Sequence, residues 1–316
     1  MECGDANRRF HRGGASLRPP PRLTPRLTKA AICIAALHIL LAMAGKLLIV
    51  GTPLGNLSDM PPRAIEALKS ADLILCEDTR HTRKLLTHFG IDRPTDSYHE
   101  HNEDAKAEAL ADRIERGETL ALVSDAGMPV VSDPGYRIVR IARERGLRVE
   151  PVPGPFAGVL ALAASGIPPL PFTFVGFTPH RQGERLDFYR RAAELGHTVI
   201  VYESPERVVA SLEDALEVFG DTEVAVAREM TKLHEEILSG TISSVLATLR
   251  ERERVYGEIT LVFAAPAREA AEVSTETLRA EFERLRESGM RRNDAVKAVA
   301  EKFGMRKNDV YRLLAG

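Results

Sequence analysis

Short apolar runs alternate with helical patterns from residue 46 to residue 152, and this alternation constrains the fold more than any other feature. The buried-strand patterns lie at residues 47–50, 73–76, 119–122 and 148–152. Helical patterns stand between them, one starting near Pro61 with Asp59 as its cap, and others over 81–89, 103–116 and 136–145. Parallel strands need crossover helices, so the pattern predicts a parallel, doubly wound sheet.

A second α/β pattern follows residue 155. A small-residue helix runs through Ala164, a Gly/Pro hinge follows, and strand patterns appear at 172–175, 198–202, 223–227 and 258–263. Compared with the strands before residue 155, these strands alternate more between apolar and polar residues and contain more β-branched residues, which predicts a mixed sheet. Residues 266–273 resemble a linker, and the remainder has helix-turn-helix spacing. We therefore expect α/β domains over 46–155 and 156–266 and a small helical tail over 274–316.

The first 45 residues are predicted to be a separate extension. Residues 1–29 are rich in Arg and Pro without periodicity, which is typical of disorder. Residues 30–44 are apolar behind a basic flank, as in a signal peptide, but Met43 lies just before the first strand. A mis-started or loose extension is therefore preferred over export. The 3 cysteines form no CxxC pair and no certain membrane span is present, so we expect a cytoplasmic protein without a membrane partner.

The segment Val-Ser-Asp-Ala-Gly-Met-Pro-Val-Val-Ser-Asp-Pro-Gly, residues 123–135, directly follows the third strand. Its Gly residues permit positive φ and close approach to a ligand, and its Pro residues fix φ. Open α/β sheets bind ligands at the carboxyl ends of their strands. The segment is therefore predicted to shape a pocket.

Several motifs in a fixed order together identify a family. They are Gly51–Leu57, Glu77–Arg80, His99–Glu103, Ser124–Gly135, Pro153–Pro155, Gly176-Phe177, Tyr202–Ser204, Ala227–Lys232 and Gly257-Glu258. With them, the chain from Lys46 onward resembles the ribosomal RNA small subunit methyltransferase I family of the tetrapyrrole methylase superfamily. The resemblance implies two α/β domains with S-adenosylmethionine in the cleft between them, and homodimers. It also implies 2′-O-methylation of a cytidine ribose in the decoding region of 16S rRNA. The acceptor stays open between naked 16S rRNA and the assembled 30S subunit, with the subunit preferred because neighbouring RNA shapes a decoding-region nucleotide.

The resemblance also implies a cofactor site built from the turns after the strands. The residues carried over are Pro53, Leu54, Asp125, Ala126, Gly127, Pro155, Phe156, Ala157, Gly257, Glu258 and Ile259. Asp125 is the main polar candidate, and Leu54 and Phe156 are expected to pack on the adenine or the methionine chain. No GxGxxG follows the first strand, so an ordinary dinucleotide site is not expected. No metal is expected, because the leaving group is neutral once the methyl has gone.

Polar residues at other strand ends are the catalytic candidates. They are Lys232, Glu229, Arg80, Asp78 and His101. Lys232 is expected to stabilise the ribose oxyanion or a phosphate with Glu229 orienting it, and Arg80 to grip a phosphate. The general base stays open between a neutral Lys and a His. Around His101, an RNA-facing or dimer-facing loop is preferred over a metal site.

The net charge of −2 means that RNA must be met by local basic patches. The expected RNA contacts are Arg80, Arg181, Arg185, Lys307 and Arg312. Two alternatives remain: a tetrapyrrole methyltransferase on the same fold, and a non-enzymatic nucleic-acid-binding ligand sensor. The basic helical tail argues against a small porphyrinoid substrate.

Overall fold

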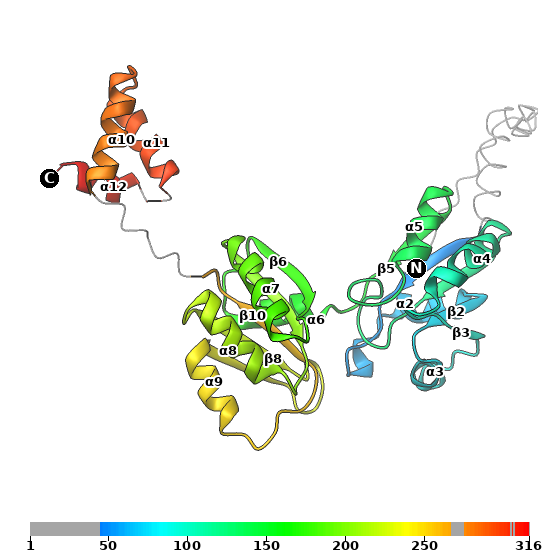
Figure 1. Ribbon diagram of the computed structural model, residues 1–316. Helices are drawn as coiled ribbons and strands as arrows, with labels where there is room; N and C mark the ends of the chain where they lie inside the picture. Colours follow the sequence, from blue (N-terminus) through cyan, green and yellow to red (C-terminus); the bar gives the residue numbers. More distant parts are fainter. Residues whose placement is uncertain (1–44, 267–274, 304, 306, 316) are drawn as a thin grey trace, which may run out of the picture. The chain divides into compact units, whose positions relative to one another are not determined.

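The computed structural model describes residues 45–266, 275–303, 305 and 307–315 (Figure 1). The expected extension over 1–45 lies outside these residues except for Gly45, and so does most of the expected linker. Within the described ranges, no helix is both long and apolar enough to span a bilayer.

The first sheet is entirely parallel. Its strands are β1 (Lys46–Val50), β2 (Leu73–Cys76), β3 (Thr95–Ser97), β4 (Thr119–Leu122) and β5 (Arg148–Val152), in the order β3-β2-β4-β1-β5. The prediction of a parallel, doubly wound sheet is confirmed. Strand β3 was not expected, because its sequence Thr-Asp-Ser has no apolar residue and offers no strand signal.

Helices cover both faces of this sheet. On one face, α2 (Pro62–Ser70) and α3 (Thr79–His88) bury Leu68 and Leu86 in one apolar core. On the other, α4 (Glu103–Glu115) and α5 (Tyr136–Glu144) bury Leu110 and Ile138 in a second core. Alternate residues of each strand fill the two cores, because successive strand side chains point to opposite faces.

The helix starts differ from the expectation at two places. Asp59 does not cap α2, because it ends a short 3₁₀ turn, Leu57–Asp59, and the cap position falls on Pro61 without a side-chain hydrogen bond. Helix α3 begins at Thr79, two residues earlier than expected. The Asp78 carboxylate caps it by accepting a hydrogen bond from the Arg80 backbone N–H at 2.8 Å.

The second sheet is mixed, as predicted. Its strands are β6 (Phe172–Phe177), β7 (Thr198–Glu203), β8 (Glu223–Arg228), β9 (Glu236–Thr241) and β10 (Ile259–Phe263), in the order β6-β7-β10-β8-β9. Strands β6 and β7 pair in parallel, and the other pairs are antiparallel. Strand β9 was missed, because Glu-Ile-Leu-Ser-Gly-Thr has too short an apolar run to stand out.

Helices also cover both faces of the second sheet. One core receives α7 (Gln182–Glu194), α8 (Val208–Phe219) and α9 (Ile242–Arg250), and the other receives α6 (Ala157–Ser165). The tail forms α10 (Thr275–Glu287), α11 (Arg292–Lys302) and α12 (Lys307–Ala315) around an apolar core of its own that includes Leu278, Val299 and Val310. The expected helical tail is therefore present.

Candidate functional site

A cavity of about 390 Å³ lies at the carboxyl end of the first sheet and takes part of its wall from the second sheet. The residues that line it are Leu54, Asp125, Ala126, Gly127, Met128, Val131, Ser132, Asp133, Phe156, Ala157, Phe177, Tyr202, Glu203, Ser204, Pro205, Gly257, Glu258, Ile259 and Thr260. Its position at strand ends is the usual place for ligands in open α/β sheets.

The loops after β1 and β4 are joined by backbone hydrogen bonds beside the cavity. The N–H of Thr52 donates to the Gly127 carbonyl at 2.9 Å, and the N–H of Gly127 donates to the Thr52 carbonyl at 3.0 Å. The Thr52 hydroxyl also donates to the Ser124 carbonyl at 3.1 Å. Both loops therefore form one wall of defined geometry.

The backbone of the loop after β4 is strained. Val130 has φ 77° and Ser132 has φ 64°, a region that non-glycine residues rarely occupy and that β-branched residues avoid. Val130 nevertheless packs against the second apolar core. A Cβ on Gly135 would come 2.4 Å from a Leu122 methyl carbon, so this end of the loop also needs glycine. Such strain is concentrated at functional sites, and here it sets the direction of Val131, Ser132 and Asp133, which line the cavity.

Aromatic rings supply an apolar wall. Phe156 and Tyr202 both line the cavity, and Phe174 packs edge-on between them, at centroid distances of 5.0 Å and 4.8 Å. Phe177 contacts Tyr202 at 5.3 Å. Burial raises the pKa of Tyr202 to about 12, so its phenol stays neutral. This wall suits a planar or apolar part of a ligand.

Carboxylates gather on the side of the first sheet. Burial raises the pKa of Asp133 to about 7, with a further contribution from Glu77; the Ser124 hydroxyl acts in the opposite direction, and Asp125 adds a smaller upward one. Burial and then the charge of Asp125 also raise the pKa of Glu77. The Asp125 Oδ1 atom is buried without a hydrogen-bond partner. Buried polar atoms are normally paired, so this oxygen is open to a donor from a ligand.

Lys232 and Glu229 form an ion-pair cluster next to the cavity. The Lys232 Nζ lies 2.8 Å from Glu229 Oε1 and 3.2 Å from the carboxylate of Glu258, a cavity residue. A Cβ on Gly55 would lie 2.2 Å from the Lys232 Cγ, so the lysine stem packs on the loop after β1. Burial alone would lower the pKa of Lys232, but its bonds to Glu229 and the charge of Glu258 raise it, and the lysine stays charged.

The structure brings together most of the predicted cofactor residues. Leu54, Asp125, Ala126, Gly127, Phe156, Ala157, Gly257, Glu258 and Ile259 line the cavity. Pro53 and Pro155 do not line it; Pro155 borders a separate hollow beside Thr231. Sequence reasoning did not select Ser132, Asp133, Phe177 or Tyr202, although each lies in or beside a motif that it had singled out.

The predicted catalytic residues do not line the cavity. Asp78 and Arg80 pair with each other at 3.3 Å, with the Arg80 side chain 89% exposed. His101 is exposed, its ring 5.9 Å from that of His99. Glu229 touches the wall indirectly, because its Oε1 accepts a hydrogen bond from the Glu258 backbone N–H at 3.0 Å. Among the described residues, no three His, Cys, Asp or Glu side chains converge as a metal site.

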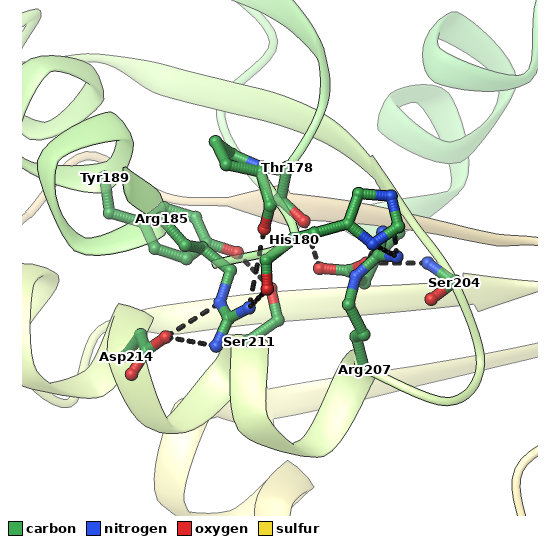
Figure 2. A network of polar contacts seen from close by, with 10 residues as sticks. Thr178, His180, Arg185, Tyr189, Ser204, Arg207, Ser211 and Asp214 are labelled. Atoms are coloured by element: carbon green, nitrogen blue, oxygen red, sulfur yellow. Dashed lines mark hydrogen bonds and ion pairs between the residues drawn. The ribbon is translucent and has the colours of Figure 1, made fainter. Parts of the chain in front are cut away.

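Arg185 is buried, which contradicts its predicted contact with RNA. Figure 2 shows its guanidinium pointing to Asp214, with Nη2 2.6 Å from a carboxylate oxygen. Both side chains are almost inaccessible, at 5% and 3% exposed. Arg185 therefore links α7 to α8 inside the fold. Arg181 is exposed and pairs with Glu184, and Lys307 and Arg312 are exposed on α12.

A second part of the network in Figure 2 reaches the cavity. The buried carboxylate of Glu203 accepts hydrogen bonds from Thr178 and the Ser204 N–H, and pairs with Arg207 at 2.7 Å. Figure 2 labels these three partners of Glu203. An Nη1–His180 Nδ1 contact at 2.9 Å also holds Arg207. The Ser204 hydroxyl is buried without a partner. Glu203 and Ser204 line the cavity, so this network fixes the wall at the end of β7.

These walls fit S-adenosylmethionine. Its adenine needs an apolar wall, which Leu54, Phe156 and Tyr202 provide. Its sulfonium and ammonium groups are cationic and match the acidic side, where Asp125 has an unpartnered oxygen. The cavity volume lies within the range of small-molecule sites.

Comparisons with known proteins agree with this fold. The family model described as Tetrapyrrole (Corrin/Porphyrin) Methylases matches residues 46–246. The chain is 43% identical over 269 residues to Ribosomal RNA small subunit methyltransferase I of Xylella fastidiosa, covering 84% of this chain and 98% of that protein. It is 44% identical over 218 residues to the protein of that name from Thermotoga maritima, covering 69% of this chain and 97% of that one.

The solved structure of diphthine synthase has the same fold. It superposes with a TM-score of 0.57 at 15% identity, over 70% of this chain and 90% of that chain. Together, the family match and the extended identity show that the chain belongs to the tetrapyrrole methylases and, within them, to the ribosomal RNA small subunit methyltransferase I family.

Proposed function

We propose that this chain methylates the 2′-hydroxyl of a cytidine ribose in the decoding region of 16S rRNA. The methyl donor of the family is S-adenosylmethionine. The proposal includes a homodimer acting on the 30S subunit in the cytoplasm. One observation supports it most: a cavity with one aromatic wall and one acidic wall, in a chain whose 40%-identical relatives are named for the small-subunit ribosomal RNA.

The reaction needs a fixed acceptor and a group that removes its proton. The sulfonium donor supplies an activated methyl group. A ribose hydroxyl is a weak nucleophile, so the chain must hold it in line with that methyl and accept the hydroxyl proton. Positioning alone is worth on the order of 7–11 kcal/mol in favourable cases.

Asp133 is the group in this cavity best suited to accept the proton. It lines the cavity, and its pKa of about 7 leaves a carboxylate that is basic enough to act near neutral pH. Lys232 does not suit that task, since its raised pKa and two carboxylate partners keep it protonated. In this proposal Lys232 is a positioning residue that holds Glu258 and the loop after β1.

Methyl transfer to defined acceptors tests the proposal. The chain is incubated with radiolabelled S-adenosylmethionine and 30S subunits that lack this modification, and the rRNA is digested to nucleosides. Label in 2′-O-methylcytidine is expected. Label in a base, or none while the donor still binds, would contradict the proposal. Parallel reactions with naked 16S rRNA and with a porphyrinoid distinguish the assembled subunit from the other acceptors.

A further inference from the structure

One face of α3 is a cationic surface, which we call the α3 face and define as Arg80, Arg83, Lys84, Thr87 and His88. These residues stand three or four positions apart, so they share one side of the helix. All of them are exposed, and together they line a shallow hollow. The opposite side of the helix is anchored in the apolar core by Leu86.

The charge of the α3 face is largely unneutralised. Within the part of the chain that the structure describes, neither Arg83 nor Lys84 has a carboxylate within 4 Å, and Arg80 pairs only with its neighbour Asp78. Helix α5 behaves differently, because its residues Arg137 and Arg140 pair with Asp104 and Glu144. A surface of paired charges attracts a polyanion weakly, whereas unpaired cations in a row attract it strongly.

The α3 face begins at the sheet edge that holds the cavity. Helix α3 follows β2 after two residues, and β2 lies beside β4, with the Val123 N–H donating to the Leu75 carbonyl at 2.9 Å. Asp125 comes two residues after Val123 and lines the cavity. Glu77, just before α3, is close enough to Asp125 and Asp133 for their charges to interact.

We propose that the α3 face binds the phosphate backbone of the RNA whose ribose enters the cavity. This inference rests on the proposed function and adds the surface that holds the substrate. Phosphates are the groups that Arg and Lys bind on nucleic acids, and the α3 face has no Phe, Tyr or Trp to stack on bases. Its one ring, that of His88, packs edge-on against Phe89 at 4.8 Å between ring centroids. The contact is therefore to the backbone, and its strength depends on salt and little on sequence.

The test removes two charges without touching the cavity. The variant Arg83→Gln with Lys84→Gln replaces exposed residues by a good helix former. The matched control is Arg116→Gln with Arg143→Gln, which removes the same charge. Both residues are exposed, and neither has an ion pair within the described chain. Arg116 directly follows α4 and Arg143 lies on α5, so both belong to the opposite face of the first sheet. Affinity for 30S subunits is measured by filter binding at several salt concentrations, and steady-state kinetics are measured with 30S as the varied substrate.

The α3 variant is expected to bind 30S about 10–100-fold more weakly at low salt. The slope of log affinity against log salt should flatten by roughly 1.4–1.8, since each lost phosphate contact removes about 0.7–0.9. The KM for 30S should rise with kcat nearly unchanged, and calorimetric affinity for S-adenosylmethionine should stay that of the wild type. Equal affinity and slope in the α3 variant and the control would overturn the inference. If wild-type protein binds 30S but does not methylate it, the proposed function fails. The difference in 30S affinity between the α3 variant and the control still shows in that case whether the α3 face binds RNA.

Discussion

At the scale of single residues, Asp133 connects the cavity to the pH dependence of the reaction. Its carboxylate must be ionised to accept a proton, so log kcat/KM should rise with pH and level off above about 7. Asp133→Asn should lose about 10²–10⁴-fold in kcat, with donor affinity changed only a few-fold. A pH profile of 30S methylation for both proteins checks this, and an active Asn variant with the same profile would remove Asp133 from the mechanism.

The same residue has a calculable effect on stability. Because the folded pKa of Asp133 lies above its ordinary value of 3.8, the folded state favours the protonated form. Protonation of Asp133 therefore stabilises the folded state. This stabilisation is complete below pH 3.8 and is lost as pH rises through about 7. The Asn variant should therefore resist urea better than wild type at pH 8, and this gain should shrink at pH 5. Loss of stability at pH 8 would mean that Asp133 is paired in the fold.

Asp125 is the residue on which donor affinity is expected to depend most. Its buried, unpartnered Oδ1 can accept one hydrogen bond from a cationic or N–H group of the ligand. Such charged bonds are worth about 1.5–3 kcal/mol, so Asp125→Ala should weaken S-adenosylmethionine binding about 10–150-fold by calorimetry. Asp92→Ala, at an exposed position outside the cavity, is the control. Equal affinity of both variants would show that S-adenosylmethionine does not bind to the Asp125 carboxylate.

More of the expected cofactor residues than of the expected catalytic residues line the cavity. The expected cofactor residues lie in contiguous motifs at strand ends, and the topology of a parallel sheet brings strand ends together. The fate of Arg185 depended on Asp214, 29 positions away on another helix, and no local pattern reveals that partner. Asp133 belonged to a recognised motif, but its importance comes from burial beside Glu77, which only the fold shows.

At the scale of elements, the Arg185–Asp214 pair joins α7 to α8. Removing one partner leaves a buried charge without compensation, so Arg185→Met should lower the free energy of unfolding by about 3–5 kcal/mol. The double variant with Asp214→Leu should recover much of this loss, because no charge remains unpaired. Urea unfolding measures both. Arg181→Met, which breaks an exposed pair, should change stability by less than about 1 kcal/mol.

Elements with strong apolar runs were predictable, and short polar ones were not. Strands β1, β2 and β4 each contain an unbroken run of three or four apolar residues, and the structure places them at the centre of the first sheet. Strands β3 and β9 are edge strands that contain polar residues. They form because they pair with a neighbouring strand, and their local sequence alone does not favour a strand.

At the scale of the whole molecule, the tail has its own apolar core and is expected to be separable. The Thermotoga maritima relative aligns over 218 residues, nearly its full length, which is shorter than the span from β1 to the end of α12. A chain ending at Pro266 should therefore keep donor affinity within about 2-fold of wild type, by calorimetry. We also expect weaker 30S binding, because the tail carries exposed Lys307 and Arg312. Loss of donor binding would show that the tail supports the cavity.

The division into units at residues 155/156 and 266/274 remains a proposal. Limited proteolysis tests the second of these boundaries. Early cleavage is expected between residues 266 and 274, and the fragment that contains both sheets should persist.

The strained loop after β4 has a consequence for how this chain tolerates change. Val130 and Ser132 have positive φ angles that glycine or asparagine adopts at lower conformational cost. A selection for heat-resistant variants is therefore expected to replace these two residues first. A glycine there would relieve the steric cost but would also make other backbone conformations accessible, so the loop would hold Asp133 in the cavity wall less firmly. Resistance to heat and turnover therefore compete at these two positions, and a variant selected for one is expected to lose the other.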